Sequence, residues 1–296
     1  MLLIEEGRWA DLLGLAAGDV ATPEERRELA HMIAVEAPPA LAVAAAELYP
    51  GEVVGFPGPL WEVVAQRPWH DLAPHLTHPR VRELVAQTRV LHGEDLRGVV
   101  PSEIPLLLES WESAHWDPED DIPEYHSTGS AGSHIWCFPH WLIENLPGGV
   151  PLSPASADPI EHPAVTVLEN LNEPHKPIRA YAFRTTAWEA AATIAADRET
   201  CRAAEVSFAQ AYPHLVHLAT GFGPYAVAEE GGQALGRLAV WRALSLMAGG
   251  DPVTVFVERL RCVAWHRPAE QMCFLNLTIE DPVQGLTWAL TASATD

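Results

Sequence analysis

The segment 115–126 gathers side chains that bind cations or exchange protons. Its sequence, His-Trp-Asp-Pro-Glu-Asp-Asp-Ile-Pro-Glu-Tyr-His, contains two histidines and five carboxylates. Its two prolines exclude a regular helix. Crowded carboxylates repel one another, and water, protonation or a bound cation relieves that repulsion. The segment is therefore either a functional loop, with Glu124 and His126 as candidate catalytic residues, or a solvated acidic surface.

Four acids of this loop have oxygen ligands of the kind that magnesium and calcium prefer. They are Asp117, Glu119, Asp121 and Glu124. The loop does not follow the EF-hand pattern, because no glycine stands at the sixth position and prolines interrupt it. A cation here would need a different geometry, and the acidic surface remains the alternative.

A second arrangement combines two loop residues with three later ones. His115-x-Asp117 is followed by His175 and then by Arg184-x-Thr186. This order resembles the His-x-Asp…His triad and Arg-x-Ser/Thr anchor of iron- and 2-oxoglutarate-dependent oxygenases. The resemblance implies that His115, Asp117 and His175 bind a divalent metal such as iron, manganese or zinc. It also implies that Arg184 and Thr186 hold 2-oxoglutarate, the arginine by a bidentate pair with a carboxylate.

A third cluster, His134-x-x-Cys137-x-x-His140, offers nitrogen and sulfur ligands at close spacing. A structural zinc site needs a fourth ligand, for which His126 is the nearest candidate. The alternative is a packed aromatic segment in which Cys137 acts as a small buried hydrophobe. No paired Cys-x-x-Cys knuckle is present, and this favours the packed segment.

The remaining motifs exclude more than they predict. His214-x-x-His217 lacks the metalloprotease pattern and is typical of two partly exposed helix histidines. Lys176 is the only lysine and stands in Pro-His-Lys-Pro, so a phosphate-binding loop and a Schiff-base lysine are both excluded. No Gly-x-Ser-x-Gly elbow occurs, which removes the simplest hydrolase.

The charge balance restricts the partners. Forty acidic residues against eighteen basic ones give a formal net charge of −22. A phosphate backbone or an anionic membrane surface would be repelled over most of such a chain. We therefore expect a small-molecule substrate or a protein partner, and neither a nucleic acid nor a membrane.

The cysteines and the apolar runs indicate a cellular location. The four cysteines are scattered without a Cys-x-x-Cys pair, which suits reduced thiols better than a disulfide framework. The first residues lack the basic and apolar regions of a signal peptide. No uninterrupted apolar run has the length of a bilayer span. The sequence predicts a soluble, cytoplasmic protein.

The elements that would position these groups differ along the chain. Residues 1–100 read as short helices, the clearest starting at Thr22-Pro23-Glu24-Glu25 with a capping hydroxyl, an early proline and acids in the first turn. Further helices are predicted over 40–48, 60–65 and 78–90, in an arrangement like a helical solenoid. Residues 101–163 have little periodicity, yet four tryptophans favour an ordered, irregular segment.

Residues 164–296 show mixed helix and strand patterns. We expect helices over 186–196, 202–211 and 234–247, and strands over 164–168, 178–183, 253–265, 272–279 and 285–293. The last three strands are predicted to form an antiparallel meander. The fold class is therefore α+β, with a helical N-terminal layer, an irregular middle rich in tryptophan and histidine, and C-terminal helices on a small antiparallel sheet.

The chain also looks similar to uncharacterised actinobacterial proteins that share a helical front half and a closing Trp-Ala-Leu-x-Ala segment, here Trp288 to Ala292. The near absence of lysine fits a GC-rich genome. This resemblance implies no activity. Two functions stay open: a small-molecule enzyme with its site in the 115–126 loop, or a non-catalytic module that docks a partner through its helices and exposed aromatic residues.

Overall fold

The computed structural model of the protein describes residues 6–50, 58–114, 124–127, 129–131, 149–172, 178–195, 201–220, 232–266 and 274–293. The chain divides into two compact units. The first comprises Met1–Leu108, Asp117–His134 and Val227–Leu235, and the second comprises Glu109–Trp116, Ile135–Ala226 and Gly236–Asp296. No helix among the described residues is long and apolar enough to cross a membrane.

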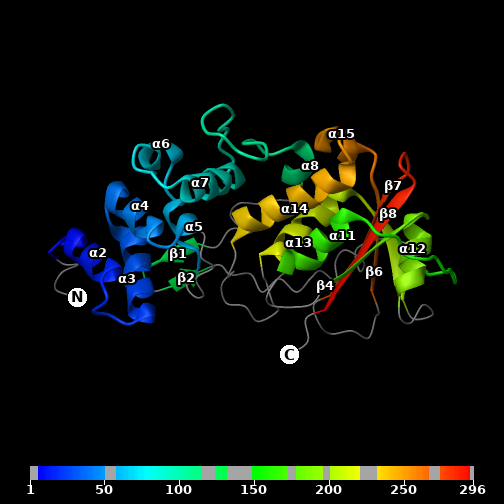
Figure 1. Ribbon diagram of the computed structural model, residues 1–296, viewed down its shortest axis with the longest axis horizontal. Coiled ribbons are helices and arrows are strands. Elements are labelled where there is room, and N and C mark those ends of the chain that lie inside the picture. The colour runs from blue at the N-terminus through cyan, green and yellow to red at the C-terminus, as the bar shows by residue number, and fades with distance from the viewer. Residues whose placement is uncertain are drawn as a thin grey trace. The chain divides into compact units, whose positions relative to one another are not determined.

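Helices dominate the first unit (Figure 1). They are α2 (Trp9–Ala17), α3 (Pro23–Glu36), α4 (Pro39–Glu47), α5 (Leu60–Val64), α6 (Trp69–Leu72) and α7 (Pro79–Leu91). The predicted start of α3 is confirmed: the Thr22 hydroxyl accepts a hydrogen bond from the Glu25 backbone N–H at 3.2 Å, which completes a capping box. Ile33, Trp61 and Leu84 are fully buried between these helices.

A small hairpin also belongs to the first unit. Strand β1 (Glu124–His126) pairs with β2 (Gly129–Ala131) in antiparallel fashion, and β1 packs against α3. The hairpin lies at the end of the acidic segment, within a region for which the sequence predicts no regular element.

The second unit is built on a six-stranded sheet in the order β3-β5-β6-β7-β8-β4, and every neighbouring pair is antiparallel. The strands are β3 (Val150–Pro151), β4 (Ile178–Phe183), β5 (Arg202–Val206), β6 (Arg261–His266), β7 (Phe274–Asp281) and β8 (Leu286–Ser293). The remaining helices are α8 (Ser110–Ser113), α11 (Pro163–Glu169), α12 (Ala187–Ile194), α13 (Phe208–Ala219), α14 (Gln233–Ala248) and α15 (Val253–Glu258), with the 3-10 turn η1 (Asn170–Asn172).

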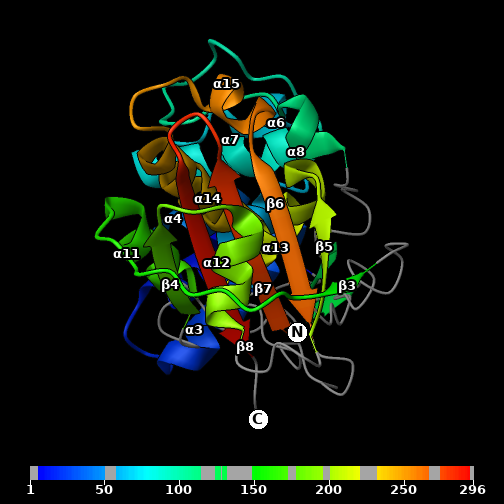
Figure 2. The ribbon, with the colours of Figure 1, turned by 90° about the vertical axis from the view of Figure 1, so that its right-hand side faces the viewer.

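Helices cover both faces of this sheet. Figure 2 shows α12 in front of the strands and α13 behind them, and both helices contact β6 and β7. Alternation along β7 explains the two layers, because Leu277 and Ile279 share one face while Thr278 and Glu280 lie on the other. Thr278 and Glu280 bond to the backbone of Ala187 at the start of α12, so the polar face of β7 positions that helix.

The α+β fold class is confirmed. The strand predicted over 178–183 is β4, and the helices predicted over 186–196 and 234–247 are α12 and α14. Three predicted elements are wrong. The strand over 164–168 is helix α11, because Pro163 occupies its first turn and the His162 ring accepts a hydrogen bond from the Ala164 N–H at 3.2 Å.

The other two errors each merge a helix with a strand. The helix over 202–211 is instead β5 followed by α13, and the signal for the change is the capping box of Ser207 and Gln210. The strand over 253–265 is instead α15 followed by β6. The β-branched run from Val253 is helical in spite of its strand propensity, because Phe256 and Val257 are buried by tertiary packing.

Candidate functional site

Strand β1 presents the two predicted catalytic residues on one exposed face. Glu124 and His126 are exposed, while Tyr125 between them is buried with 2% of its surface accessible. Side chains at positions i and i+2 of a strand point to the same side, so the carboxylate and the imidazole are neighbours. The register pairs Glu124 with Ala131 and His126 with Gly129, residues with the smallest side chains.

Three contacts from beneath fix this strand. The Tyr125 hydroxyl donates to Glu62 Oε2 at 2.8 Å. His31, which is buried, donates from Nε2 to the carbonyl of His126 at 2.7 Å. The carboxamide of Gln66 faces the peptide N–H and C=O of Tyr125. The strand is therefore attached at consecutive residues to α3, to α5 and to the turn after α5.

Glu62, which accepts the hydrogen bond from Tyr125, has no accessible surface. Its other carboxylate oxygen accepts a hydrogen bond from the backbone N–H of Gln233, and the N–H of Ala234 bonds to the same carboxylate. Burial raises the pKa of Glu62 to about 6, although the bonds from Tyr125, Gln233 and Ala234 oppose the shift.

Two glycines permit the close packing around Glu62. Gly232 has φ of +73°, and a Cβ there would lie 2.8 Å from Glu62 Oε1. Gly58 has φ of +132°, and a Cβ there would lie 2.5 Å from the Tyr125 ring. Both positions therefore need glycine for backbone conformation and for space.

The 2-oxoglutarate contacts implied by the resemblance lie in the second unit. Arg184 is exposed in the turn between β4 and α12. Thr186 is the N-cap of α12, where its hydroxyl accepts from the Glu189 N–H at 3.3 Å and donates to the Glu189 carboxylate at 3.1 Å. Thr186 thus has a structural role, and its predicted contact with a cofactor stays a prediction.

The predicted metal ligands His115, Asp117 and His175 lie outside the described residues, as do the zinc candidates His134, Cys137 and His140. Within the described residues, no group of three or more His, Cys, Asp or Glu side chains is arranged to hold a metal ion.

The two histidines of the His-x-x-His motif differ from expectation. His214 and His217 do lie on one helix, α13, but they are buried, with 3% and 4% of their surface accessible. Partial exposure is therefore wrong, because α13 packs on a sheet face and buries nearly all of its length.

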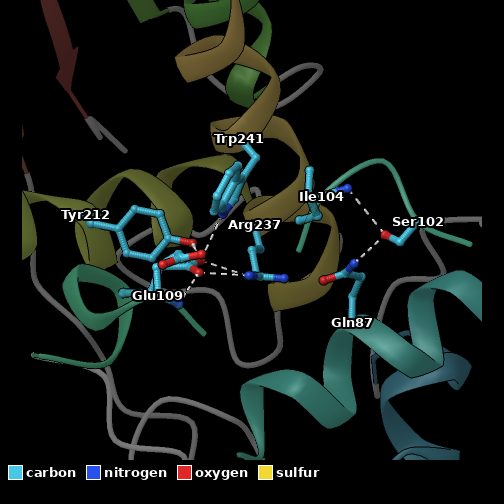
Figure 3. A network of polar contacts seen from close by, with 8 residues as sticks. Gln87, Ser102, Ile104, Glu109, Tyr212, Arg237 and Trp241 are labelled. Atoms are coloured by element: carbon cyan, nitrogen blue, oxygen red, sulfur yellow. Dashed lines mark hydrogen bonds and ion pairs between the residues drawn. The ribbon is translucent and has the colours of Figure 1, made fainter. Parts of the chain in front are cut away.

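The second unit has a buried glutamate of its own, Glu112 on α8. Arg237 donates to it from Nε and Nη2, both at 2.8 Å, and the Tyr212 hydroxyl and Trp241 Nε1 donate to Oε1 at 2.5 and 2.9 Å. Figure 3 shows these side chains converging, together with Glu109, whose backbone N–H donates to Oε2 at 3.0 Å. In the first unit, the same figure draws Gln87 donating to Ser102.

Charge pairing decides the protonation of this second network. Burial alone would raise the pKa of Glu112, but the ion pair with Arg237 and the hydrogen bonds outweigh it and lower that pKa. Burial and the neighbouring negative charge raise the pKa of Tyr212 well above its ordinary value. The rings of Phe208, Tyr212 and Trp241 surround Trp111 at centroid distances of 4.9 to 5.4 Å. A carboxylate with five donors inside aromatic packing is suited to hold α8, α13 and α14 together.

Neither buried glutamate belongs to a recognisable motif, although each network leaves a local signal in the sequence. Glu62 is a single acid within the apolar run Leu60-Trp-Glu-Val-Val64, and Arg237 is one of two bases in the apolar helix α14, where the other, Arg242, is exposed. A charged residue inside an apolar run is either exposed to solvent or buried together with hydrogen-bonding or charged partners.

No protein-family model, curated protein or solved structure matches the chain.

Proposed function

We propose that the protein is a small-molecule enzyme in which Glu124 and His126 form the acid–base pair. The observation that carries the proposal is their common position on the exposed face of a strand that contacts with the buried Glu62 and His31 attach at Tyr125 and His126. The imidazole of His126 would take or give the proton, and the Glu124 carboxylate would orient it and balance its charge.

The surroundings of β1 support this assignment. Catalytic geometry must be held within a fraction of an ångström, and an attached strand does this better than a free loop. The carboxyl group of Glu62, directly beneath, has the perturbed pKa that is common near active sites.

The metal is the part of the proposal that rests on sequence alone. A divalent ion at His115, Asp117 and His175 would add Lewis-acid or redox chemistry. Arg184 and Thr186 would hold 2-oxoglutarate only if the oxygenase resemblance extends to the reaction.

The docking alternative has less support. The large hydrophobic side chains that are exposed among the described residues are all aliphatic, such as Val20, Val255 and Val283. None of them is aromatic, whereas docking surfaces are enriched in tryptophan and tyrosine. We therefore favour the enzyme.

The proposal is tested by untargeted substrate profiling. Purified protein is incubated with a pooled bacterial small-molecule extract, with and without added Fe(II), Mn(II), Zn(II) and 2-oxoglutarate, and consumption is followed by liquid chromatography–mass spectrometry. The wild type should consume at least one compound. His126→Ala and Glu124→Gln should each slow that consumption by about 100-fold or more, which is the usual contribution of a general acid or base.

His70→Ala is the matched control, because His70 is also a histidine of the first unit and its side chain is 80% exposed. It should turn over the same compound at the wild-type rate. Wild-type rates in both β1 variants, or no compound consumed under any condition, would contradict the proposal.

A further inference from the structure

We infer that Glu62 is a pH-sensitive latch of the first unit, which holds α5, β1 and the first turn of α14 together more firmly when its carboxyl group is protonated. The inference goes beyond the proposed activity and does not depend on it.

The geometry of the latch is a single side chain that joins three distant segments. Glu62 itself is on α5, its Oε2 binds the Tyr125 hydroxyl on β1, and its Oε1 binds the N–H of Gln233 at the start of α14. These partners are 63 and 171 residues away along the chain. A change in the protonation of this one carboxyl group therefore affects the contacts that join α5 to β1 and to the first turn of α14.

No described cationic side chain bonds to the Glu62 carboxylate. On α7, which packs against α5, Arg89 donates to the Ala65 carbonyl at 2.8 Å and pairs with Glu94 at 2.6 Å. From β1 the facing titratable group is Tyr125, and from α3 it is His31, whose ring lies 6.3 Å from the Tyr125 ring. From α14 the described partners are two neutral peptide groups. None of the described groups that bond to the carboxylate is cationic, unlike the arginine that neutralises Glu112.

The packing determines the sign of the effect. Glu62 has no accessible surface, and the glycine at 232 brings backbone so close that water cannot surround the carboxylate. Removing a carboxylate from water disfavours its charged form. The folded unit therefore binds the proton more tightly than an opened unit does, with a pKa of about 6 against an ordinary value near 4.5. The attachment is firmest below pH 4.5 and weakens as the pH rises through 6.

Hydrogen–deuterium exchange at pH 5 and pH 7, corrected for the intrinsic exchange rate, tests the latch in the full-length protein. In the wild type, the opening equilibrium of peptides covering 58–66, 124–131 and 232–236 should rise roughly tenfold from pH 5 to pH 7. Glu62→Gln keeps the shape of the side chain but cannot ionise, so its opening should be the same at both values. Peptides from β7 and β8 serve as an internal control in every sample.

Tyr125→Phe provides an independent reading. The hydroxyl of Tyr125 lowers the pKa of Glu62, so its removal should move the pH at which opening increases to a higher value. An unchanged transition in Tyr125→Phe would overturn the latch even if Glu62→Gln fails to fold. A tenfold rise in Glu62→Gln equal to that of the wild type, or constant protection in the wild type, would also overturn it.

Discussion

Among the described residues, the first unit and the second unit each bury one glutamate completely, and the two carboxyl groups behave in opposite ways. Glu62 and Glu112 both have 0% accessible surface. Burial raises the pKa of Glu62 to about 6, whereas the pKa of Glu112 is lowered. The difference lies in the partners, since Glu112 receives a two-pronged ion pair from Arg237 and Glu62 receives bonds from described neutral groups only. Burial alone therefore does not determine whether a glutamate is ionised.

Glu112 has a structural role, whereas Glu62 changes its protonation state near neutral pH. Glu112 stays ionised and joins α8 to α13 and α14 through five donors. Glu62 titrates close to neutral pH, beneath the strand that exposes Glu124 and His126. The proposed catalytic pair and the group with the unusual pKa thus belong to the same unit, whereas the second unit has the neutralised pair.

The largest expected effect on stability comes from removing Arg237, the counter-ion of Glu112. Arg237→Met leaves Glu112 buried without its counter-ion, and we expect a loss of about 3–5 kcal/mol in the free energy of unfolding. Urea denaturation measures this loss. Arg242→Met, which changes an exposed arginine on the same helix, should cost no more than about 1 kcal/mol, because an exposed charge contributes little even when it is paired. A cost for Arg237→Met as small as that of Arg242→Met would show that the ion pair does not hold the second unit together.

A smaller effect is expected for Glu62, whose contribution to the free energy of unfolding should depend on pH. Because its pKa is raised on folding, its contribution to stability is fully present below pH 4.5 and is lost as the pH rises through 6. Between pH 4.5 and pH 7 the wild type should lose roughly 2 kcal/mol relative to Glu62→Gln. Urea denaturation of both proteins across this range gives the difference, from which titration of all other groups cancels. Parallel pH profiles would mean that Glu62 titrates normally.

The fold was predictable where sequence signals are local. The capping box at Thr22, the proline-led helices and the alternation of β7 and β8 follow from short patterns. The prediction failed where apolar runs fit helix and strand equally well, as in α11 and α15. Tertiary burial, which a local pattern does not contain, decides those segments.

The candidate site was predictable only in part. Clustering of acids and histidines drew attention to 115–126, and its described end holds Glu124 and His126 on one exposed face. Glu62 was missed because its partners, Tyr125 and Gln233, are remote in the sequence and no spacing rule connects them. For the same reason, the ion pair of Glu112 and Arg237 becomes visible only when the chain is folded.

The most direct test of this contrast is a titration of both carboxyl groups by NMR, with ¹³C-labelled glutamate and resonances assigned through Glu62→Gln and Glu112→Gln. We predict that the Glu62 carboxyl carbon titrates near pH 6, while that of Glu112 titrates below the ordinary value of 4.5. A midpoint for Glu62 at or below 4.5 would contradict the contrast between the two units and remove the basis for the latch.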